Sequence, residues 1–137
     1  MSVVRRAASA RSVMTKQTSQ RKIRSLTWAL MSSSLLLLFV FVSLAAHVRL
    51  GLGHWPAPML ETYQTAAYDG HEQVFIWVAL FTVYAAVPLW LVLLCFGMFR
   101  ISLKTHVIQT GIYAVGWALI ALYSFIDPGR FTEWFLD

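Results

Sequence analysis

Residues 74–99 read VFIWVALFTVYAAVPLWLVLLCFGMF and contain no Asp, Glu, Lys or Arg. A helix needs about 20 apolar residues to cross the hydrocarbon core of a bilayer. Residues 26–48 and 107–126 form two further runs without a formal charge. Because unpaired backbone groups are costly in lipid, each run must be helical. The sequence therefore predicts an all-α integral membrane protein with three transmembrane helices, an ordered outer loop over 49–73 and a short interfacial C-terminal helix in the tail 127–137.

The composition agrees with this class. The chain of 137 residues is 58% apolar and 12% charged, whereas a soluble domain averages about a quarter charged residues. Cys95 is the only cysteine, so an intrachain disulfide scaffold is excluded. We expect Cys95 to be a small packing residue.

The net charge of +5 is concentrated at the N-terminus. Residues 1–25 hold seven of the 11 basic residues and no acid, which leaves 4 basic and 6 acidic residues, a net of −2, in 26–137. This predicts a basic, partly disordered cytoplasmic arm over 1–25 and a membrane domain over 26–137, and it argues against nucleic-acid binding. The positive-inside rule then places the C-terminus outside. The Arg- and Ser-rich arm, which is free of acidic residues, is also compatible with a transit peptide and hence with an organelle inner membrane, and removal of a signal or transit peptide stays open.

Small residues on the third run indicate close helix packing. Their steps of three, four and three place them on one face, along which a second backbone can approach in lipid. We expect the second and third helices to form a tight antiparallel hairpin, with the first packed against them. The helix-packing residues are Gly111, Ala114, Ala118 and Ala121 on the third helix, and Ala79 and Ala86 on the second.

Local signals refine the remaining segments. Asp69 and Glu72 are spaced as a capping box for the start of the second helix, and Pro88 predicts a kink near residues 84–85. In the tail, Phe131, Trp134 and Phe135 would form the apolar face of a helix lying on the outer surface, as an anchor or a docking surface. Aromatic residues expected at the membrane interface are Trp28, Trp55, Tyr63, Tyr68 and Trp134.

Three histidines, His47, His54 and His71, border or lie in the outer loop, with the carboxylates Glu61, Asp69 and Glu72. Imidazole suits Zn, Cu and Fe, although the spacings of seven and seventeen residues match no compact ligand motif. His47 and His71 end neighbouring helices at similar depth, so bis-histidine haem ligation is geometrically conceivable. The prediction is that no cofactor is bound, with these three residues as the metal candidates and His47 and His71 as the haem candidates.

Two groups of residues are expected to be structural. His106 begins the third helix beside Lys104, where we expect it to be solvated. Trp90 and Trp117 lie deep in their runs, and each indole N–H should find a hydrogen-bond partner. The runs contain no ionisable group at mid-depth of the kind that ion or proton transport requires.

The segment from Arg49 to Pro58, RLGLGHWPAP, resembles a loop of small uncharacterised bacterial inner-membrane proteins. Those proteins have about three helices and a G-x-W-P turn after the first, here Gly53-His54-Trp55-Pro56. The resemblance implies a bacterial inner membrane and implies no activity and no functional residue.

These patterns predict a non-catalytic protein that acts as an accessory, assembly or scaffold subunit of a larger membrane complex. Its expected partners are the lipid bilayer and another membrane protein. One alternative is an outward-facing metal- or haem-binding redox component that uses His47, His54 and His71. Another is a small transporter or channel subunit. No catalytic residue is predicted, because no activated-nucleophile signature is found.

Overall fold

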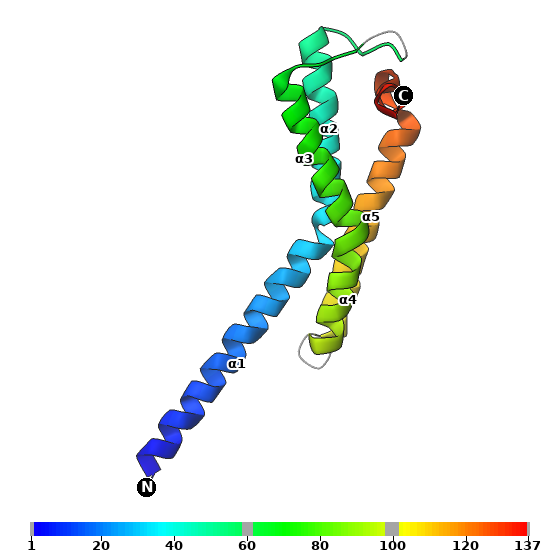
Figure 1. The fold of residues 1–137 in the computed structure, drawn as a ribbon. Coiled ribbons are helices and arrows are strands. Elements are labelled where there is room, and N and C mark those ends of the chain that lie inside the picture. The colour runs from blue at the N-terminus through cyan, green and yellow to red at the C-terminus, as the bar shows by residue number, and fades with distance from the viewer. Residues whose placement is uncertain (1, 59–61, 98–101, 137) are drawn as a thin grey trace.

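The computed structural model describes the backbone of residues 2–58, 62–97 and 102–136, and these residues are helical or in connecting turns, without a strand. The prediction of an all-α chain is confirmed. Figure 1 shows a helical bundle. The C-terminus and the loop segments 53–58 and 62–65 lie at one end of the bundle, and the N-terminus lies beyond the opposite end. The elements are α1 (Ser2–Met31), α2 (Ser33–Leu52), α3 (Ala66–Leu80), the π-helix η1 (Phe81–Ala85), α4 (Ala86–Gly97), α5 (Leu103–Ile126), the 3-10 turn η2 (Pro128–Arg130) and α6 (Phe131–Leu136).

Within the described residues, three helical stretches, Ser33–Leu52, Ala66–Cys95 and Leu103–Ile126, are long and apolar enough to cross a membrane, and we call them the first, second and third spans. Their number agrees with the three helices that the sequence predicts and is consistent with a multi-pass membrane protein. The boundaries differ from the sequence prediction. The first span begins at Ser33 instead of residue 26, and the second begins at Ala66 instead of residue 74 and has its expected end, residues 98–99, outside the described residues.

A bend at Ser32 separates α1 from α2. The Ser32 hydroxyl donates to the Ala29 carbonyl oxygen at 3.1 Å, and such bonds to the preceding turn often bend helices. The amides of Leu35 and Leu36 both donate to the Ser32 carbonyl oxygen. Figure 1 shows α1 leaving the bundle at this point. The arm, expected to be partly disordered over 1–25, continues α1 as helix back to Ser2.

The second span is interrupted near the predicted kink. The amide of Ala86 donates to the carbonyl oxygen of Phe81, five residues earlier, which makes 81–85 a π-helical turn. Pro88 has no N–H for the Tyr84 carbonyl, so the α-helical pattern breaks one turn before the proline.

The N-terminus of the second span differs from the predicted capping box of Asp69 and Glu72. Helix α3 begins at Ala66, and the Thr65 hydroxyl, not Asp69, accepts the Tyr68 amide at 3.1 Å.

The first span lies at the centre of the packing. The most extensive contacts join α2 with α3, α2 with α5, and α1 with α4, so the expected tight hairpin between the second and third spans is not the arrangement found. Helix α5 approaches α2 through Gly116, where an added Cβ would lie 2.6 Å from the Cβ of Ser34. Small residues do bring helices together, but on the face opposite to the predicted one. The residues Gly111, Ala114, Ala118 and Ala121 are all exposed.

The tail folds back onto the bundle instead of lying free on the membrane surface. Asp127 (φ 39°) and Gly129 (φ 70°) adopt left-handed conformations that reverse the chain, and a Cβ at Gly129 would lie 2.6 Å from the Trp55 Cβ. The Asp127 carboxylate then accepts the amides of Thr132 (2.5 Å) and Glu133 (3.3 Å) at the start of α6. The predicted tail helix is therefore present, but its aromatic face packs on this chain's own core.

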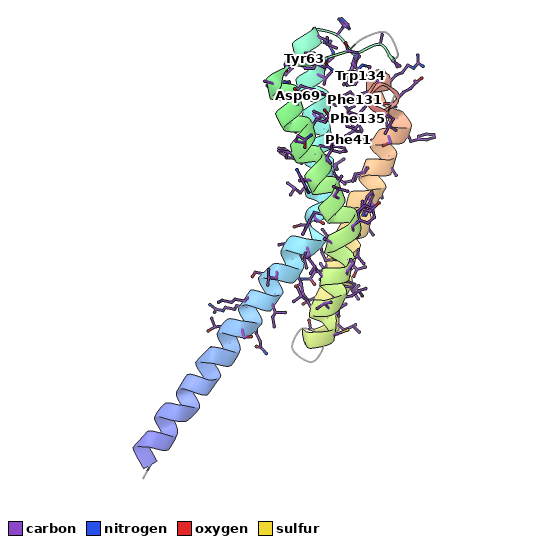
Figure 2. All side chains as sticks on the ribbon, in the orientation of Figure 1. Phe41, Tyr63, Asp69, Phe131, Trp134 and Phe135 are labelled. Atoms are coloured by element: carbon purple, nitrogen blue, oxygen red, sulfur yellow. The ribbon has the colours of Figure 1, made fainter. Side chains whose placement is uncertain are left out.

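Two halves of the bundle meet where Ser32, η1 and Gly116 lie. We call α2, α3, α6 and residues 117–126 of α5 the loop half. Its buried core contains Phe41, Leu44, Ala45, Val48, Tyr68 and Phe131, and Figure 2 labels several of its aromatic residues at this end. The arm half comprises residues 24–31 of α1, α4 and residues 103–113 of α5, with the smaller apolar cluster Leu30, Met31 and Ala86.

Candidate functional site

Two of the three candidate metal ligands are in direct contact. His47 on α2 and His71 on α3 place their Nδ1 atoms 3.3 Å apart, and the Nε2 atom of His71 lies 2.8 Å from the Ser43 hydroxyl. Both imidazoles are half-buried, and the ring of Tyr63 meets that of His47 edge-on at 6.0 Å. The pair and the serine form one polar chain between α2 and α3, just below the loop.

The geometry separates the metal hypothesis from the haem hypothesis. Two nitrogens bound to one tetrahedral zinc ion are roughly 3.3 Å apart, since each Zn–N bond is about 2.0–2.1 Å. The observed separation of the two Nδ1 atoms is a hydrogen-bond distance between the rings, and it is also compatible with that value. A bis-histidine haem instead needs the imidazoles on opposite faces of a porphyrin, and direct contact between the rings leaves no space for one.

The third candidate ligand does not join this pair. His54 is exposed, and its Nδ1 bonds the neighbouring Trp55 carbonyl oxygen at 2.9 Å. Glu61 lies outside the described residues. Among the residues that the structure describes, no group of three His, Cys, Asp or Glu side chains could hold a metal ion. Any metal bound by His47 and His71 would therefore need further ligands from outside the described residues, such as water or another molecule.

A buried polar cluster in the arm half was not predicted. The Gln109 amide donates to the Thr27 hydroxyl at 2.9 Å, and both residues are fully buried. Tyr113 donates its phenolic hydroxyl to the Thr82 carbonyl oxygen at 2.9 Å, and Thr82 donates to the carbonyl oxygen of Ser33 at 3.3 Å. These bonds connect all three spans where the sequence indicated apolar packing. Gln109 inside an otherwise apolar run was the available signal.

His106 belongs to the same half, and it is buried, whereas the sequence predicts a solvated position. Its side chain is only 8% exposed, because the last turns of α1 and helix α4 cover the start of α5. Its ring meets that of Trp90 edge-on at 6.3 Å. Within the described part of the chain, neither ring nitrogen of His106 has a hydrogen-bond partner, and neither does the Trp90 indole nitrogen.

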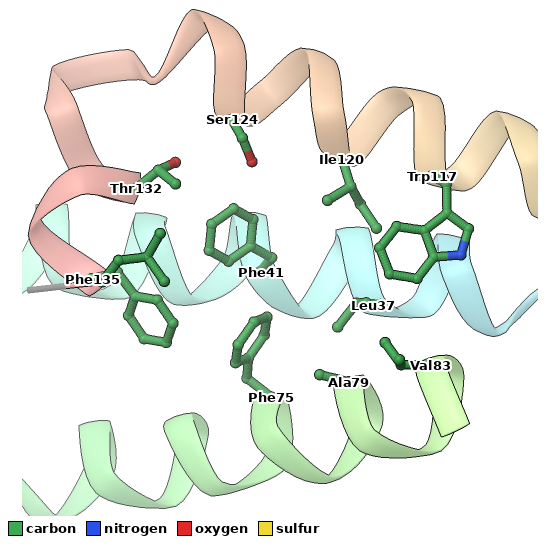
Figure 3. A pocket seen from close by; sticks show the side chains of 11 residues that line it. Leu37, Phe41, Phe75, Ala79, Val83, Trp117, Ile120, Ser124, Thr132 and Phe135 are labelled. Carbon is green, nitrogen blue, oxygen red and sulfur yellow. The ribbon is translucent and has the colours of Figure 1, made fainter. Parts of the chain in front are cut away.

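A third feature is an apolar pocket in the loop half, between α3 and α5 and in front of α2 (Figure 3). Its volume is about 290 Å³. Three phenylalanine rings pack along one side, with centroid separations of 5.4 Å between Phe41 and Phe75 and 5.3 Å between Phe75 and Phe135. Five helical segments contribute residues to the pocket, so no local sequence pattern predicts it. The lining residues are Leu37, Phe41, Phe75, Ala79, Val83, Trp117, Ile120, Ser124, Thr132, Phe135 and Leu136.

The predicted interface aromatics divide into two groups. Trp28 is half-buried and Trp55 is exposed, with the Arg49 guanidinium 6.0 Å from its ring. Tyr63, Tyr68 and Trp134 contact one another or the loop-half core, with centroid separations of 5.6 Å for the two tyrosines and 6.3 Å for Tyr68 and Trp134. Of the predicted helix-packing residues, Ala86 is fully buried and Ala79 is half-buried in the pocket wall.

Comparison of the chain with models of protein families, with curated proteins and with solved structures finds no match.

Proposed function

We propose that this protein is a non-catalytic accessory subunit of a larger membrane complex, which it joins through one face of α5. That face carries Gly111, Ala114, Ala118 and Ala121, and we call it the small-residue face. The observation that carries the proposal is that all four residues are exposed. Within the described residues, no atom beyond the neighbouring turns of α5 lies within 4 Å of a Cβ added at Gly111.

The physical argument concerns what drives helix association in lipid. Lipid tails are as apolar as leucine, so association depends on close packing between helices, which small residues permit. The chain uses Gly116 for this purpose in its own bundle. The small-residue face is a second such surface that this chain leaves uncovered, and it suits a transmembrane helix of a partner. We further propose a bacterial inner membrane with a cytoplasmic N-terminus, supported by the seven basic residues of the arm.

Native gel electrophoresis after gentle-detergent extraction tests the proposal. We expect the wild-type chain to migrate in an assembly larger than itself, and the double variant Gly111→Leu, Ala118→Leu to be released from it. Ala46→Leu, an exposed position on α2, is the matched control and should stay in the assembly. A wild-type chain that migrates alone at 15.5 kDa, or an assembly that tolerates the double variant, would contradict the proposal.

The 3.3 Å separation of the His47 and His71 nitrogens supports a second candidate function, the binding of a divalent transition metal by this pair. Metal analysis of protein incubated with Zn²⁺ and then desalted tests it. Binding that is lost in His71→Ala and kept in His54→Ala would support the pair as the site. Metal-free wild-type protein would reject it.

A further inference from the structure

Exposed cations gather at the end of the bundle from which α1 extends. We call four of them the basic belt, namely Arg21, Lys22 and Arg24 on α1 and Lys104 in the first turn of α5. The described acidic residues lie in the first two turns of α3, at the end of α5 and in the tail, all at the opposite end of the bundle (Figure 1). We propose that the basic belt binds the phosphate groups of anionic glycerophospholipids. This inference rests on the proposed insertion of the chain in a membrane, and not on the partner of the small-residue face.

The hydrogen bond between Thr27 and Gln109 fixes the depth of the belt. Gln109 follows Leu103, the first residue of the third span, by six residues, or roughly 9 Å at about 1.5 Å rise per residue. Arg21 precedes Thr27 by the same number of residues, and α1 and α5 both run toward the loop end of the bundle (Figure 1). The belt therefore lies close to the level at which the third span begins, where a bilayer would place its headgroups.

Apolar side chains border the belt and distinguish a lipid from a soluble polyanion. Leu26 on α1 is 53% exposed, and Leu103, next to Lys104, is 79% exposed. Trp28 is half-buried one turn after Arg24, and tryptophan is enriched at membrane interfaces. A nucleic acid bound to the belt would leave both leucines in water. In a bilayer the leucines instead contact acyl chains, while the neighbouring long cationic side chains reach the headgroups.

The charges of the belt fit phosphodiester groups. A guanidinium forms two parallel hydrogen bonds with a phosphate, and a lysine ammonium attracts it as a point charge. Clusters of about four to eight Lys and Arg residues beside a membrane-spanning helix are typical of binding to anionic lipid. No acidic side chain of the described residues lies at this end to neutralise the belt. The remaining basic residues of the arm precede the belt on the same helix and add to the positive potential: Arg5, Arg6, Arg11 and Lys16.

Lipid retention by the full chain tests the proposal. The chain is reconstituted in vesicles of equimolar phosphatidylglycerol and phosphatidylcholine, and flotation shows whether it stays with the lipid. It is then extracted in a gentle detergent and washed, and the two retained lipids are quantified by mass spectrometry. We expect more phosphatidylglycerol than phosphatidylcholine, with a smaller excess after a wash at high salt, because exposed charges are screened. The result does not depend on orientation, since both leaflets have the same composition.

Neutral variants of the belt should lose the preference. One basic residue near an anionic surface contributes roughly a fivefold change in affinity. Lys104→Gln should therefore lower the ratio of phosphatidylglycerol to phosphatidylcholine by up to about fivefold, and the triple variant R21Q, K22Q, R24Q should lower it further. Arg49→Gln is the matched control, because Arg49 lies in the last turn of α2 at the acidic end of the bundle, and it should leave the ratio unchanged. Far-UV circular dichroism identifies a triple variant that fails to fold, and the comparison of the two single variants then decides.

Three results would overturn the proposal. The first is equal retention of the two lipids by a wild-type chain that floats with the vesicles, which would leave its insertion in a membrane intact. The second is a ratio that neither Lys104→Gln nor the triple variant lowers. The third is a duplex RNA, added at the same phosphate concentration, that binds the wild type and abolishes the preference, because the belt would then bind a soluble polyanion. A chain that does not float with the vesicles contradicts the membrane proposal itself, and this inference with it.

Discussion

The buried core of the loop half is aromatic and aliphatic, and Phe41 has four aromatic rings with centroids between 5.4 and 6.1 Å from its own. In the arm half the fully buried side chains include Thr27 and Gln109, which are hydrogen-bonded to each other. The loop half includes a tail and a loop that lie beyond the ends of the membrane-length helices, where, in a membrane, burial of apolar surface from water would contribute to stability. The arm half consists of helical segments without such a loop or tail, and in lipid the association of such segments relies on packing and interhelical hydrogen bonds.

The difference indicates that the two halves respond to different substitutions. Truncation of an aromatic side chain should affect the loop half, loss of a hydrogen bond the arm half, and crowding at Gly116 the contact between α2 and α5 where the halves meet. The following predictions are ordered by the expected loss of unfolding free energy, measured by titration of mixed micelles with a denaturing detergent.

Phe131→Ala should have the largest effect. Its ring is fully buried in the loop-half core, and truncation of a buried phenylalanine costs about 3–5 kcal/mol. The unfolding transition can be followed through the fluorescence of Trp134, whose ring centroid lies 5.7 Å from that of Phe131. Phe125→Ala is the control, because Phe125 is 89% exposed. If the two variants unfold at the same detergent fraction, the tail does not contribute to the core as described.

Gly116→Leu should follow, with a loss of about 1–3 kcal/mol, the usual cost of overpacking. An added Cβ meets the backbone of Ser34 at 3.0 Å, so α2 and α5 must move apart. Gly111→Leu makes the same change five residues earlier, at a position with open space. The isolated chain carrying that variant should unfold like the wild type. The reverse ranking of the two glycines would mean that α5 is rotated relative to the structure.

The hydrogen bond between Gln109 and Thr27 should have the smallest effect. A double-mutant cycle with Gln109→Leu and Thr27→Val isolates its contribution, which we expect to be about 0.6 kcal/mol, the average for hydrogen bonds between membrane helices. The cycle is needed because each single variant also changes packing. A coupling free energy indistinguishable from zero would show that the arm half is held by packing alone.

The comparison of the two glycines also shows how far sequence reasoning reaches. Apolar runs identify the spans, because the bilayer sets a minimum length for them. They do not identify which face of a span meets its neighbour, since lipid-facing and protein-facing sides are both apolar. The spacing of Gly111, Ala114, Ala118 and Ala121 places them on one face of α5, but the structure leaves that face exposed, so its role in close packing stays a prediction. Gly116, which makes the contact with α2, has no small residue three or four positions away, so the spacing of small residues does not single it out.

The candidate sites were less predictable than the spans because they depend on contacts distant in sequence. His106 is buried because the bend at Ser32 directs the end of α1 across the start of α5, and nothing near His106 in the sequence signals that. The similar depth of His47 and His71 made them a candidate pair, but their direct contact was not predicted, because it depends on how α2 packs against α3. The separation of His54 follows from the path of the loop. Phe131 was assigned to the membrane surface because its helical spacing is compatible with either environment.

The π-helical turn of residues 81–85 has a consequence for chain length. Such a turn accommodates one extra residue within an α-helix, because its wider winding spreads about the same rotation over one more residue. Deleting Val83, which is exposed, would therefore allow a continuous α-helix and leave the orientation of α4 relative to α3 almost unchanged. Ala86 would still face Leu30 and Met31. A regular α-helical turn cannot absorb such a change, since each residue turns the helix by about 100°, so a deletion within α4 itself would turn the residues after it away from α1. The π-turn is thus the place in this helix where the chain length can change by one residue without loss of the pairing of α4 with α1.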